Sequence, residues 1–157
     1  MFQRTDFMRL VIQRAKEASV VVDGEVVGSI GQGLFVLVGV EDGDTEADME
    51  WLVQKTAGMR IFDDENGVMN RSVVDVGGGF LAVSQFTLTA STKKGNRPSY
   101  IRAAGHELAI ALYDKYCERL SAVSGIPVEK GVFGANMQCS LVNDGPVTII
   151  IDSRIRE

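Results

Sequence analysis

The sequence predicts an α+β fold, in which mainly antiparallel β-sheets form a two-layer or barrel-like roll with two principal helices packed on them. The predicted segments follow the order strands, helix, strands, helix, strands, with turn signals between neighbouring strands. This order favours antiparallel pairing over a doubly wound parallel sheet. No internal repeat or linker divides the chain. We therefore expect a single domain over residues 8–157, preceded by a short disordered extension over residues 1–7.

The composition is that of an ordinary globular protein. Hydrophobic residues make up 45% of the 157 positions and charged residues 24%. A domain near this size buries about 68–70% of its unfolded surface, which is enough for a conventional core. The longest apolar run, residues 34–40, is far shorter than the roughly 20 residues that span a bilayer. Residues 1–7 lack the apolar region of a secretory signal, so we expect a cytoplasmic protein.

The residue types present do not favour a metal site or a cofactor site. The chain has two cysteines, Cys117 and Cys139, which form no CxxC pair, and one histidine, His106. This set is too small for a disulfide framework and makes a poor zinc site. We expect two reduced thiols, no metal and no cofactor.

A β-hairpin is predicted at the N-terminus. Residues 9–22 are rich in Val and Ile and lead into Asp23-Gly24, and a similar run follows over residues 25–30. An Asp-Gly pair between two such runs is the strongest short-range hairpin signal. Residues 34–40 then predict a buried strand.

The first helix is predicted from Thr45 to about Gly58. Thr45 with Asp48 three positions later is a capping-box variant, and apolar residues recur behind it at helical spacing. Residues 59–62 predict a strand that ends in a turn over residues 63–67.

The second helix is predicted over residues 103–123, because Leu108, Leu112 and other apolar residues form one stripe. Gly125 and Pro127 are typical of a helix end. Before this helix, Gly77-Gly78-Gly79 predicts a turn that fits neither phosphate-loop fingerprint. The remaining strands are expected over residues 80–84, 128–132, 137–142 and 146–151.

The residue types disfavour a Ser-His-Asp hydrolase. The only histidine lies in the predicted second helix, and no Gly-x-Ser-x-Gly elbow is present. Chemistry would then depend on backbone dipoles, hydroxyl groups and the substrate itself.

Two polar segments beside apolar strands are candidate sites. Residues 84–88 read Ser-Gln-Phe-Thr-Leu, and their hydroxyl and amide groups follow a strand. A strand that simply alternates polar and apolar residues explains them equally well. Residues 143–148 read Asn-Asp-Gly-Pro-Val-Thr, which is also what a β-hairpin turn between two strands requires.

A third candidate is a basic segment in an acidic protein. The net charge is −5, yet Lys93, Lys94, Arg97 and Arg102 lie near Tyr100 in a stretch without acidic residues. The segment is either a solvated loop or a rim that contacts phosphates.

Together, Ser-Gln-Phe-Thr-Leu and Asn-Asp-Gly-Pro-Val-Thr resemble the paired signature segments of the D-aminoacyl-tRNA deacylase family, also called D-Tyr-tRNA deacylases. Residues 9–14, 97–99 and 133–137 resemble further family segments in the family's order. The resemblance covers roughly residues 8–152.

The resemblance implies the family's fold and a homodimeric, cofactor-free hydrolase. Its substrate would be the ester that joins a D-amino acid to the terminal adenosine of tRNA, so the reaction is a chiral proofreading step in translation. The Gly145-Pro146 bond would be cis and would reach into the partner subunit's active site, where it leaves no space for an L side chain. Glycine has no side chain to exclude, so glycyl-tRNA is also an expected substrate.

The resemblance also suggests roles for individual residues. Main-chain N–H groups around Phe86 and Thr87 would hold the oxyanion while a water molecule attacks, with Thr87 as covalent nucleophile the less favoured mechanism. Ser84 and Gln85 would shape the pocket. The expected substrate-binding residues are Asn143, Phe133, Met137 and Thr148, and the expected contacts to the tRNA backbone are Lys93, Lys94 and Arg97.

Two alternatives remain open. The chain could be a non-catalytic RNA-binding module, since no catalytic triad is present. It could also be the paralogous deacylase that acts on a mischarged L-aminoacyl-tRNA, although the first signature of that type differs from Ser-Gln-Phe-Thr-Leu.

Overall fold

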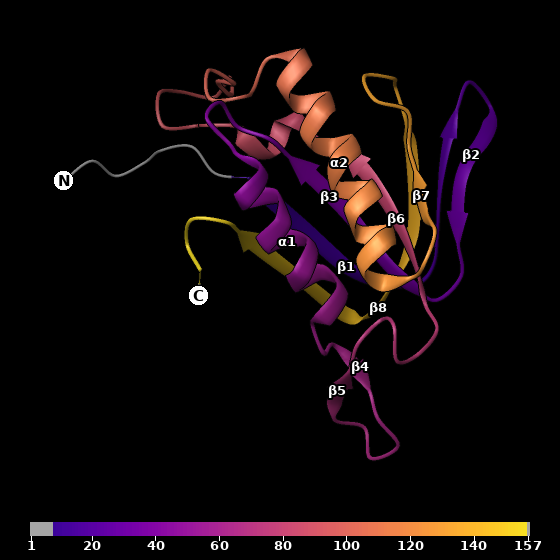
Figure 1. Cartoon of the computed structure of the whole chain (residues 1–157). Coiled ribbons are helices and arrows are strands. Elements are labelled where there is room, and N and C mark those ends of the chain that lie inside the picture. The colour runs from indigo at the N-terminus through magenta and orange to yellow at the C-terminus, as the bar shows by residue number, and fades with distance from the viewer. Residues whose placement is uncertain (1–7, 157) are drawn as a thin grey trace.

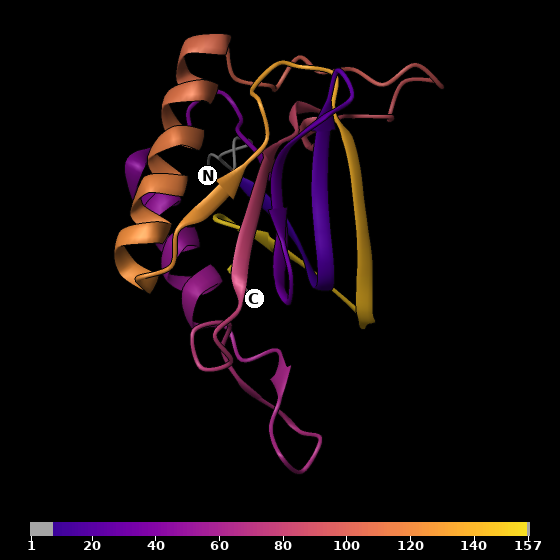
Figure 2. The same cartoon turned by 90° about the vertical axis from the view of Figure 1, so that its right-hand side faces the viewer.

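In the computed structural model, which describes residues 8–156, one curled six-stranded sheet carries both long helices on the same side (Figures 1 and 2). The predicted extension over residues 1–7 lies outside the described residues. The strands of the main sheet are β1 (Arg9–Val22), β2 (Glu25–Ile30), β3 (Gly33–Gly39), β6 (Gly79–Ser84), β7 (Val128–Lys130) and β8 (Gln138–Asp152). The other elements are α1 (Glu46–Gly58), α2 (His106–Ser124), the 3₁₀ helix η1 (Phe86–Thr89) and the small hairpin of β4 (Phe62–Asp63) and β5 (Met69–Arg71).

The long strand β1 organises the sheet. Its first half pairs with β3 and its second half with β2, while β8 runs antiparallel along nearly its whole length. The far side of β2 approaches β7 so closely that a Cβ on Gly28 would lie 2.8 Å from the carbonyl oxygen of Lys130. The sheet is therefore bent into a nearly closed, barrel-like roll, as the sequence predicted.

The sheet is mixed, because two of its strand pairs are parallel. β1 pairs antiparallel with β2, β3 and β8, whereas β3–β6 and β6–β7 are parallel. The chain reaches β6 through α1 and reaches β7 through α2, and a helical crossover returns the chain in the same strand direction. Antiparallel pairing still predominates.

The predicted local signals are confirmed. Asp23 and Gly24 have φ angles of +49° and +79° between β1 and β2, as a tight hairpin turn requires. Thr45 caps α1 with a complete capping box, in which its N–H donates to Asp48 Oδ2 at 2.9 Å. Gly125, with φ +73°, ends α2 at Ser124 in the left-handed conformation.

Some predicted boundaries were wrong. The second helix begins at His106 instead of residue 103, and the strand expected over residues 59–62 is reduced to β4. Gly79, expected in a turn, is the first residue of β6. A Cβ on Gly33 would lie 2.1 Å from the carbonyl oxygen of Gly79, so this pair of glycines allows the two backbones to approach.

The segment Asn143–Thr148 is not a hairpin turn. Asn143 pairs with Ala15 and Thr148 pairs with Gln13 of the same strand. Four residues of β8 therefore lie opposite Arg14 alone, and they form an enlarged bulge that bends the strand. The strands expected over residues 137–142 and 146–151 are the two halves of β8, whose sharp corner is visible in yellow in Figure 2.

The core lies between the helices and the inner face of the sheet. Tyr116 is fully buried, and its hydroxyl lies 2.9 Å from Thr56 Oγ1, which joins α2 to α1. The buried Tyr113 hydroxyl donates to the carbonyl of Ala82 in β6 at 2.9 Å. The first bond joins the middle of α2 to α1, and the second joins it to β6. No helix among residues 8–156 is long and apolar enough to cross a membrane.

Candidate active site

A pocket of about 270 Å³ opens where β6 ends, between the first turns of α2 and residues 133–139. The structure brings five of the predicted site residues together in its wall, and these are Ser84, Gln85, Phe86, Phe133 and Met137. Residues that are far apart in the sequence therefore form one concave surface, which is the expected form of a small-molecule site.

Among the other lining residues, Tyr113 and Cys139 carry polar groups, and neither was predicted as a site residue. Cys139 lies two positions beyond Met137 in an extended segment, and strand alternation places such residues on one face. The alternation signal could have identified Cys139. Burial raises the pKa of the Tyr113 phenol far above its ordinary value, so this hydroxyl remains a donor to Ala82 and is unsuited to act as a base.

The chain changes direction where β6 meets η1, and this exposes main-chain donors. The Gln85 N–H donates to the carbonyl of Val38 at 2.8 Å, and the Leu88 N–H donates to Gln85 at 3.3 Å. Among residues 8–156, no hydrogen bond uses the N–H of Phe86 or Thr87, as expected at the first positions of a helix. Two neighbouring amides therefore remain available, one on Phe86, which lines the pocket, and one on the next residue, Thr87.

Thr87 has no basic partner. Within the described part of the chain, its hydroxyl makes one side-chain hydrogen bond, which it accepts from Gln85 Nε2. The histidine ring of His106 instead contacts Phe133 edge-on, with ring centroids 5.2 Å apart. Nothing in this arrangement activates Thr87 as a nucleophile.

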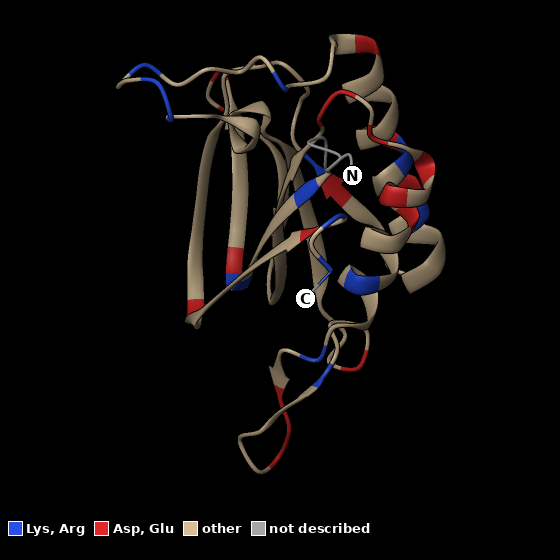
Figure 3. Ribbon diagram, turned by 90° about the vertical axis from the view of Figure 1, so that its left-hand side faces the viewer, with Lys and Arg blue, Asp and Glu red and all other residues tan. Residues whose placement is uncertain are grey.

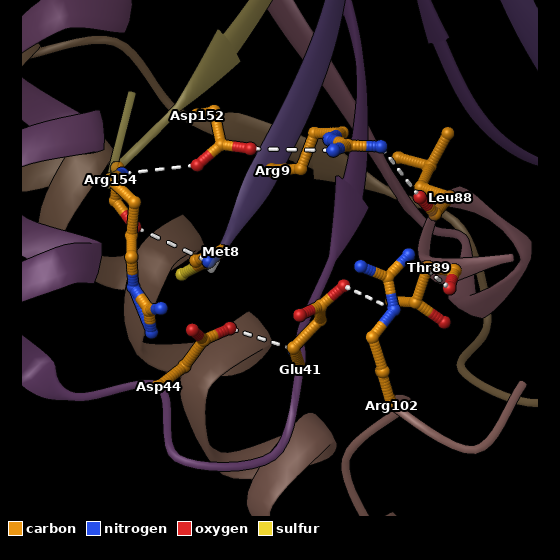
Figure 4. Close-up of polar contacts among 10 residues, drawn as sticks. Met8, Arg9, Glu41, Asp44, Leu88, Thr89, Arg102, Asp152 and Arg154 are labelled. Carbon is orange, nitrogen blue, oxygen red and sulfur yellow. Dashed lines mark hydrogen bonds and ion pairs between the residues drawn. The ribbon is translucent and has the colours of Figure 1, made fainter. Parts of the chain in front are cut away.

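Two arginines hold the other end of η1 (Figure 4). Arg9 Nη1 donates to the carbonyl of Leu88 at 3.1 Å, and Arg102 Nη2 donates to the carbonyl of Thr89 at 3.2 Å. Each guanidinium also pairs with a buried carboxylate, Arg9 with Asp152 at 3.4 Å and Arg102 with Glu41 at 3.7 Å. This network links η1 to β1, to β8 and to the segment that follows β3.

Next to Glu41 lies a second buried carboxylate, Asp44. Its Oδ2 accepts a hydrogen bond from the Glu41 N–H at 2.7 Å. Burial raises the pKa of Asp44 to about 7, and the nearby carboxylates of Asp48 and Glu41 act in the same direction. The Asp44 side chain thus changes charge close to neutral pH.

The bulge in β8 is held by its own side chains and by Arg14. Asn143 Oδ1 accepts from the Val147 N–H at 2.8 Å, and Asn143 Nδ2 donates to Thr148 Oγ1 at 3.0 Å. The Gly145-Pro146 bond is cis, and Gly145 has a φ of +142°. Arg14 Nε donates to the Asp144 carbonyl at 2.9 Å.

Among the described residues that line the pocket, none belongs to the bulge over residues 143–148. Asn143 and Thr148 align through β1 with Gly33 and Phe35 of β3, whereas Ser84 aligns with Val38. The two sites are three to five residues apart along the strands and three strands apart across the sheet. At about 3.3 Å per residue and 4.8 Å per strand, the path between them over the curled sheet is roughly 20 Å long.

The predicted tRNA-backbone residues Lys93, Lys94 and Arg97 also lie outside the pocket wall. They are exposed on a loop that projects from the body of the protein (Figure 3) and is closed by backbone hydrogen bonds of 2.8 Å between Ser91 and Ser99. Arg102, which the sequence groups with them, instead turns inward toward Glu41. Across residues 8–156, no three His, Cys, Asp or Glu side chains gather where they could hold a metal ion.

Comparison with known proteins shows which family this chain resembles. Residues 11–152 match the family model described as D-Tyr-tRNA(Tyr) deacylase. A protein named D-aminoacyl-tRNA deacylase from Parabacteroides distasonis is 58% identical over 150 residues, covering 96% of this chain and 100% of the relative. A relative of the same name from Dechloromonas aromatica is 57% identical with the same coverage.

Solved structures show the same fold. A structure described as a c-Myc DNA unwinding element binding protein has a TM-score of 0.85 at 40% identity, covering 91% of this chain and 97% of that one. A probable eukaryotic D-amino acid tRNA deacylase has a TM-score of 0.79 at 19% identity, covering 93% and 99%. With a family match over most of its length and relatives above half identity, the chain belongs to the D-Tyr-tRNA(Tyr) deacylase family.

Proposed function

We propose that this protein is a cytoplasmic D-aminoacyl-tRNA deacylase, which hydrolyses the ester between a D-amino acid and the terminal adenosine of tRNA. Family membership supports the reaction. The structural observation that carries the proposal is the pocket lined by Phe86, because the amides of Phe86 and the adjacent Thr87 have no hydrogen-bond partner among the described residues. Preorganised N–H groups of this kind stabilise the oxyanion of acyl transfer.

In this mechanism a water molecule attacks the ester carbonyl. The bond from the water oxygen to the carbonyl carbon forms, the carbon–ribose oxygen bond breaks, and a proton passes to the departing ribose oxygen. The Phe86 and Thr87 amides hold the developing oxyanion, and each such donor is worth about 10² to 10³ in rate. The neighbouring ribose hydroxyl orients the water, so no protein base is needed.

Selection against L-amino acids falls to Gly145-Pro146 of the second subunit in a homodimer. The lining of the pocket supports this, because no residue of the bulge belongs to it among the described residues. On β8, Ile150 is 68% exposed and Val142 is 46% exposed, so this strand offers apolar side chains to a second subunit. Main-chain atoms of the bulge would exclude an L side chain by contact, and Asn143 and Thr148 keep them in place.

This type of checkpoint is indifferent to the identity of the D side chain. It also cannot exclude glycine, which has no side chain, so glycyl-tRNA is proposed as an additional substrate. A glycyl ester that survives enzyme levels sufficient to clear a D-tyrosyl ester would contradict that part.

The first test is deacylation of matched D-tyrosyl-tRNA and L-tyrosyl-tRNA by the purified protein, with a chelator present. Rapid loss of the D ester alone is expected. Loss of neither ester would favour a non-catalytic RNA-binding module, and loss of the L ester alone would favour the paralogous deacylase.

The role of the main-chain donors can be tested by a pair of variants at one position. Phe86→Ala keeps the N–H, whereas Phe86→Pro removes it, and proline is tolerated at the first position of a helix. We expect Phe86→Pro to lower kcat about 100-fold further than Phe86→Ala. Equal effects of the two variants would rule out this amide as the oxyanion donor.

A purified heterodimer tests the origin of the checkpoint. One subunit carries Phe86→Pro, and the other carries Gly145→Ala, whose Cβ would lie 2.7 Å from a methyl group of Val147. The Gly145→Ala homodimer should hydrolyse the L ester as well as the D ester. In the heterodimer, the intact pocket faces the partner's intact Gly145-Pro146, and activity should be specific for the D ester. Hydrolysis of the L ester by the heterodimer would place the checkpoint within one subunit.

A further inference from the structure

A pair of exposed aromatic side chains lies just outside the pocket. Phe86 is 60% exposed and Tyr100 is 38% exposed, and their rings meet edge to face with centroids 4.9 Å apart. Ile101, which follows Tyr100, is 87% exposed. Apolar side chains of this size gathered at one point are typical of a binding surface.

The same surface is continuous with the pocket and with the basic loop. Phe86 belongs to the pocket wall, while Tyr100 and Ile101 end the loop that carries Lys93, Lys94 and Arg97. Figure 3 shows Lys and Arg along this projecting loop and no acidic residue. The loop therefore presents positive charge beside an apolar platform, in a protein whose net charge is −5.

Aromatic platforms bordered by cations suit a single-stranded nucleic acid, because bases stack on the rings and phosphates pair with the cations. The 3′ end of tRNA is single-stranded. If its terminal adenosine carries the ester into the pocket, the rim where Phe86 meets Tyr100 offers the preceding nucleotide an aromatic surface.

We propose that Tyr100 and Ile101, together with the exposed edge of Phe86, form a binding site for the unpaired nucleotide that precedes the terminal adenosine. This inference rests on the proposed deacylase function and extends it. Recognition would continue beyond the aminoacyl-adenosine, with the base stacked on Tyr100 and Ile101 and its phosphate near Lys93, Lys94 or Arg97. Binding energy from this nucleotide would hold the ester in the pocket.

The test compares two substrates with the same ester. One is D-tyrosyl-tRNA, and the other is D-tyrosyl-adenosine, released from it by a ribonuclease that cuts after pyrimidines. Tyr100→Ala should lower kcat/KM for the tRNA about tenfold or more, as expected for the loss of one base stack. It should leave kcat/KM for D-tyrosyl-adenosine within about twofold of the wild-type value. Tyr100→Phe should restore the tRNA value, and Val27→Ala, at a similarly exposed apolar residue in β2, should change neither.

The outcomes separate this inference from the proposed function. If the wild-type protein hydrolyses neither substrate, the deacylase function fails. If it hydrolyses both and Tyr100→Ala lowers both equally, or neither, the nucleotide site is overturned. Gel filtration of the variants completes the test: a shift of Tyr100→Ala or Ile101→Ser to a smaller species would assign the surface to contact between subunits and would also overturn the site.

Discussion

Arg14 and Asp144 lie 130 positions apart in the chain, yet Arg14 Nε donates to the Asp144 carbonyl oxygen at 2.9 Å. The same guanidinium donates from Nη1 to the carbonyl of Ile61 at 2.7 Å, and the arginine is only 8% exposed. A cation buried this far is stable only with such partners. Arg14 therefore joins the bulge that contains Gly145-Pro146 to the segment before β4.

Replacing Arg14 with methionine should loosen the bulge. We expect the free energy of unfolding to fall by about 2–3 kcal/mol, because one buried carbonyl and one partly buried carbonyl lose a charged donor. Discrimination between D- and L-tyrosyl esters should fall as well. Urea unfolding and paired deacylation assays measure the two effects. Arg60→Met is the control, since Arg60 is exposed and bonds only to Asn70 among the described side chains. If Arg14→Met discriminates between the D and L esters as well as the wild type does, Arg14 does not support the proposed checkpoint at Gly145-Pro146.

Replacing Thr87 with alanine should leave the single-turnover rate within about threefold of the wild-type rate. The reason is that its only described side-chain partner is the Gln85 amide, which cannot accept a proton. A covalent nucleophile would instead be expected to lose several orders of magnitude on truncation, as other nucleophilic enzymes do. Rapid-quench measurement with saturating enzyme distinguishes the two, and Thr87→Ser serves as the conservative control.

Removing the anchor of η1 should affect turnover more than binding. Arg102→Met removes the donor to the Thr89 carbonyl, so the Phe86 and Thr87 amides would be less well positioned. We expect kcat to fall about tenfold with KM nearly unchanged, as for an interaction that acts on the transition state. Because Glu41 is fully buried beside Arg102, the double variant Arg102→Met with Glu41→Gln should recover stability but not kcat. If the double variant recovers kcat together with stability, Arg102 contributes to folding and does not position the Phe86 and Thr87 amides.

The pH dependence of stability should reflect Asp44. Burial raises its folded-state pKa from 3.8 to about 7, so the folded protein binds this proton more tightly than the unfolded chain. The associated stability is fully present below about pH 4 and is lost as the pH rises toward 7. Asp44→Asn keeps an acceptor for the Glu41 N–H. It should match the wild type near pH 4 and exceed it by about 1–2 kcal/mol at pH 8, after solvent screening of the charge is allowed for. Urea titrations at both pH values test this, and a constant difference between the proteins would refute it.

The basic loop should control how strongly salt weakens tRNA binding. Substituting Lys93, Lys94 and Arg97 together with glutamine should reduce the slope of log Kd against log salt concentration by about 2, because each phosphate contact to a single strand contributes about 0.7. Hydrolysis of D-tyrosyl-adenosine should not change, since the loop lies outside the pocket. Fluorescence anisotropy with labelled tRNA gives the slope, and Lys16→Gln with Lys55→Gln supplies a charge control on other elements. An unchanged slope would show that these three side chains do not contact tRNA phosphates.

Signals that depend on a few neighbouring residues were readable before the structure was known. The Asp23-Gly24 hairpin, the Thr45 cap and the Gly125 helix end each follow from the conformational preferences of one or two side chains. The pocket wall was predicted in part, through Ser84, Gln85 and the segment that holds Phe133 and Met137, because these residues lie in motifs. The predictions failed where pairing with a strand distant in the sequence determines the local conformation. Asn143 to Thr148 has the composition of a turn, but pairing with β1 on both sides makes it a bulge.

The sequence by itself thus determined the turns and the helix caps, since these depend on hydrogen bonds and backbone conformations within a few positions. It also supplied the motifs whose residues line the pocket. Tertiary structure alone decided three further features. It made β3, β6 and β7 parallel, it placed Arg14 against Asp144 and Arg102 against Thr89, and it kept the described bulge of β8 out of the pocket wall. Each depends on contacts between segments that are distant in the chain, which form only when burial of the common core brings those segments together.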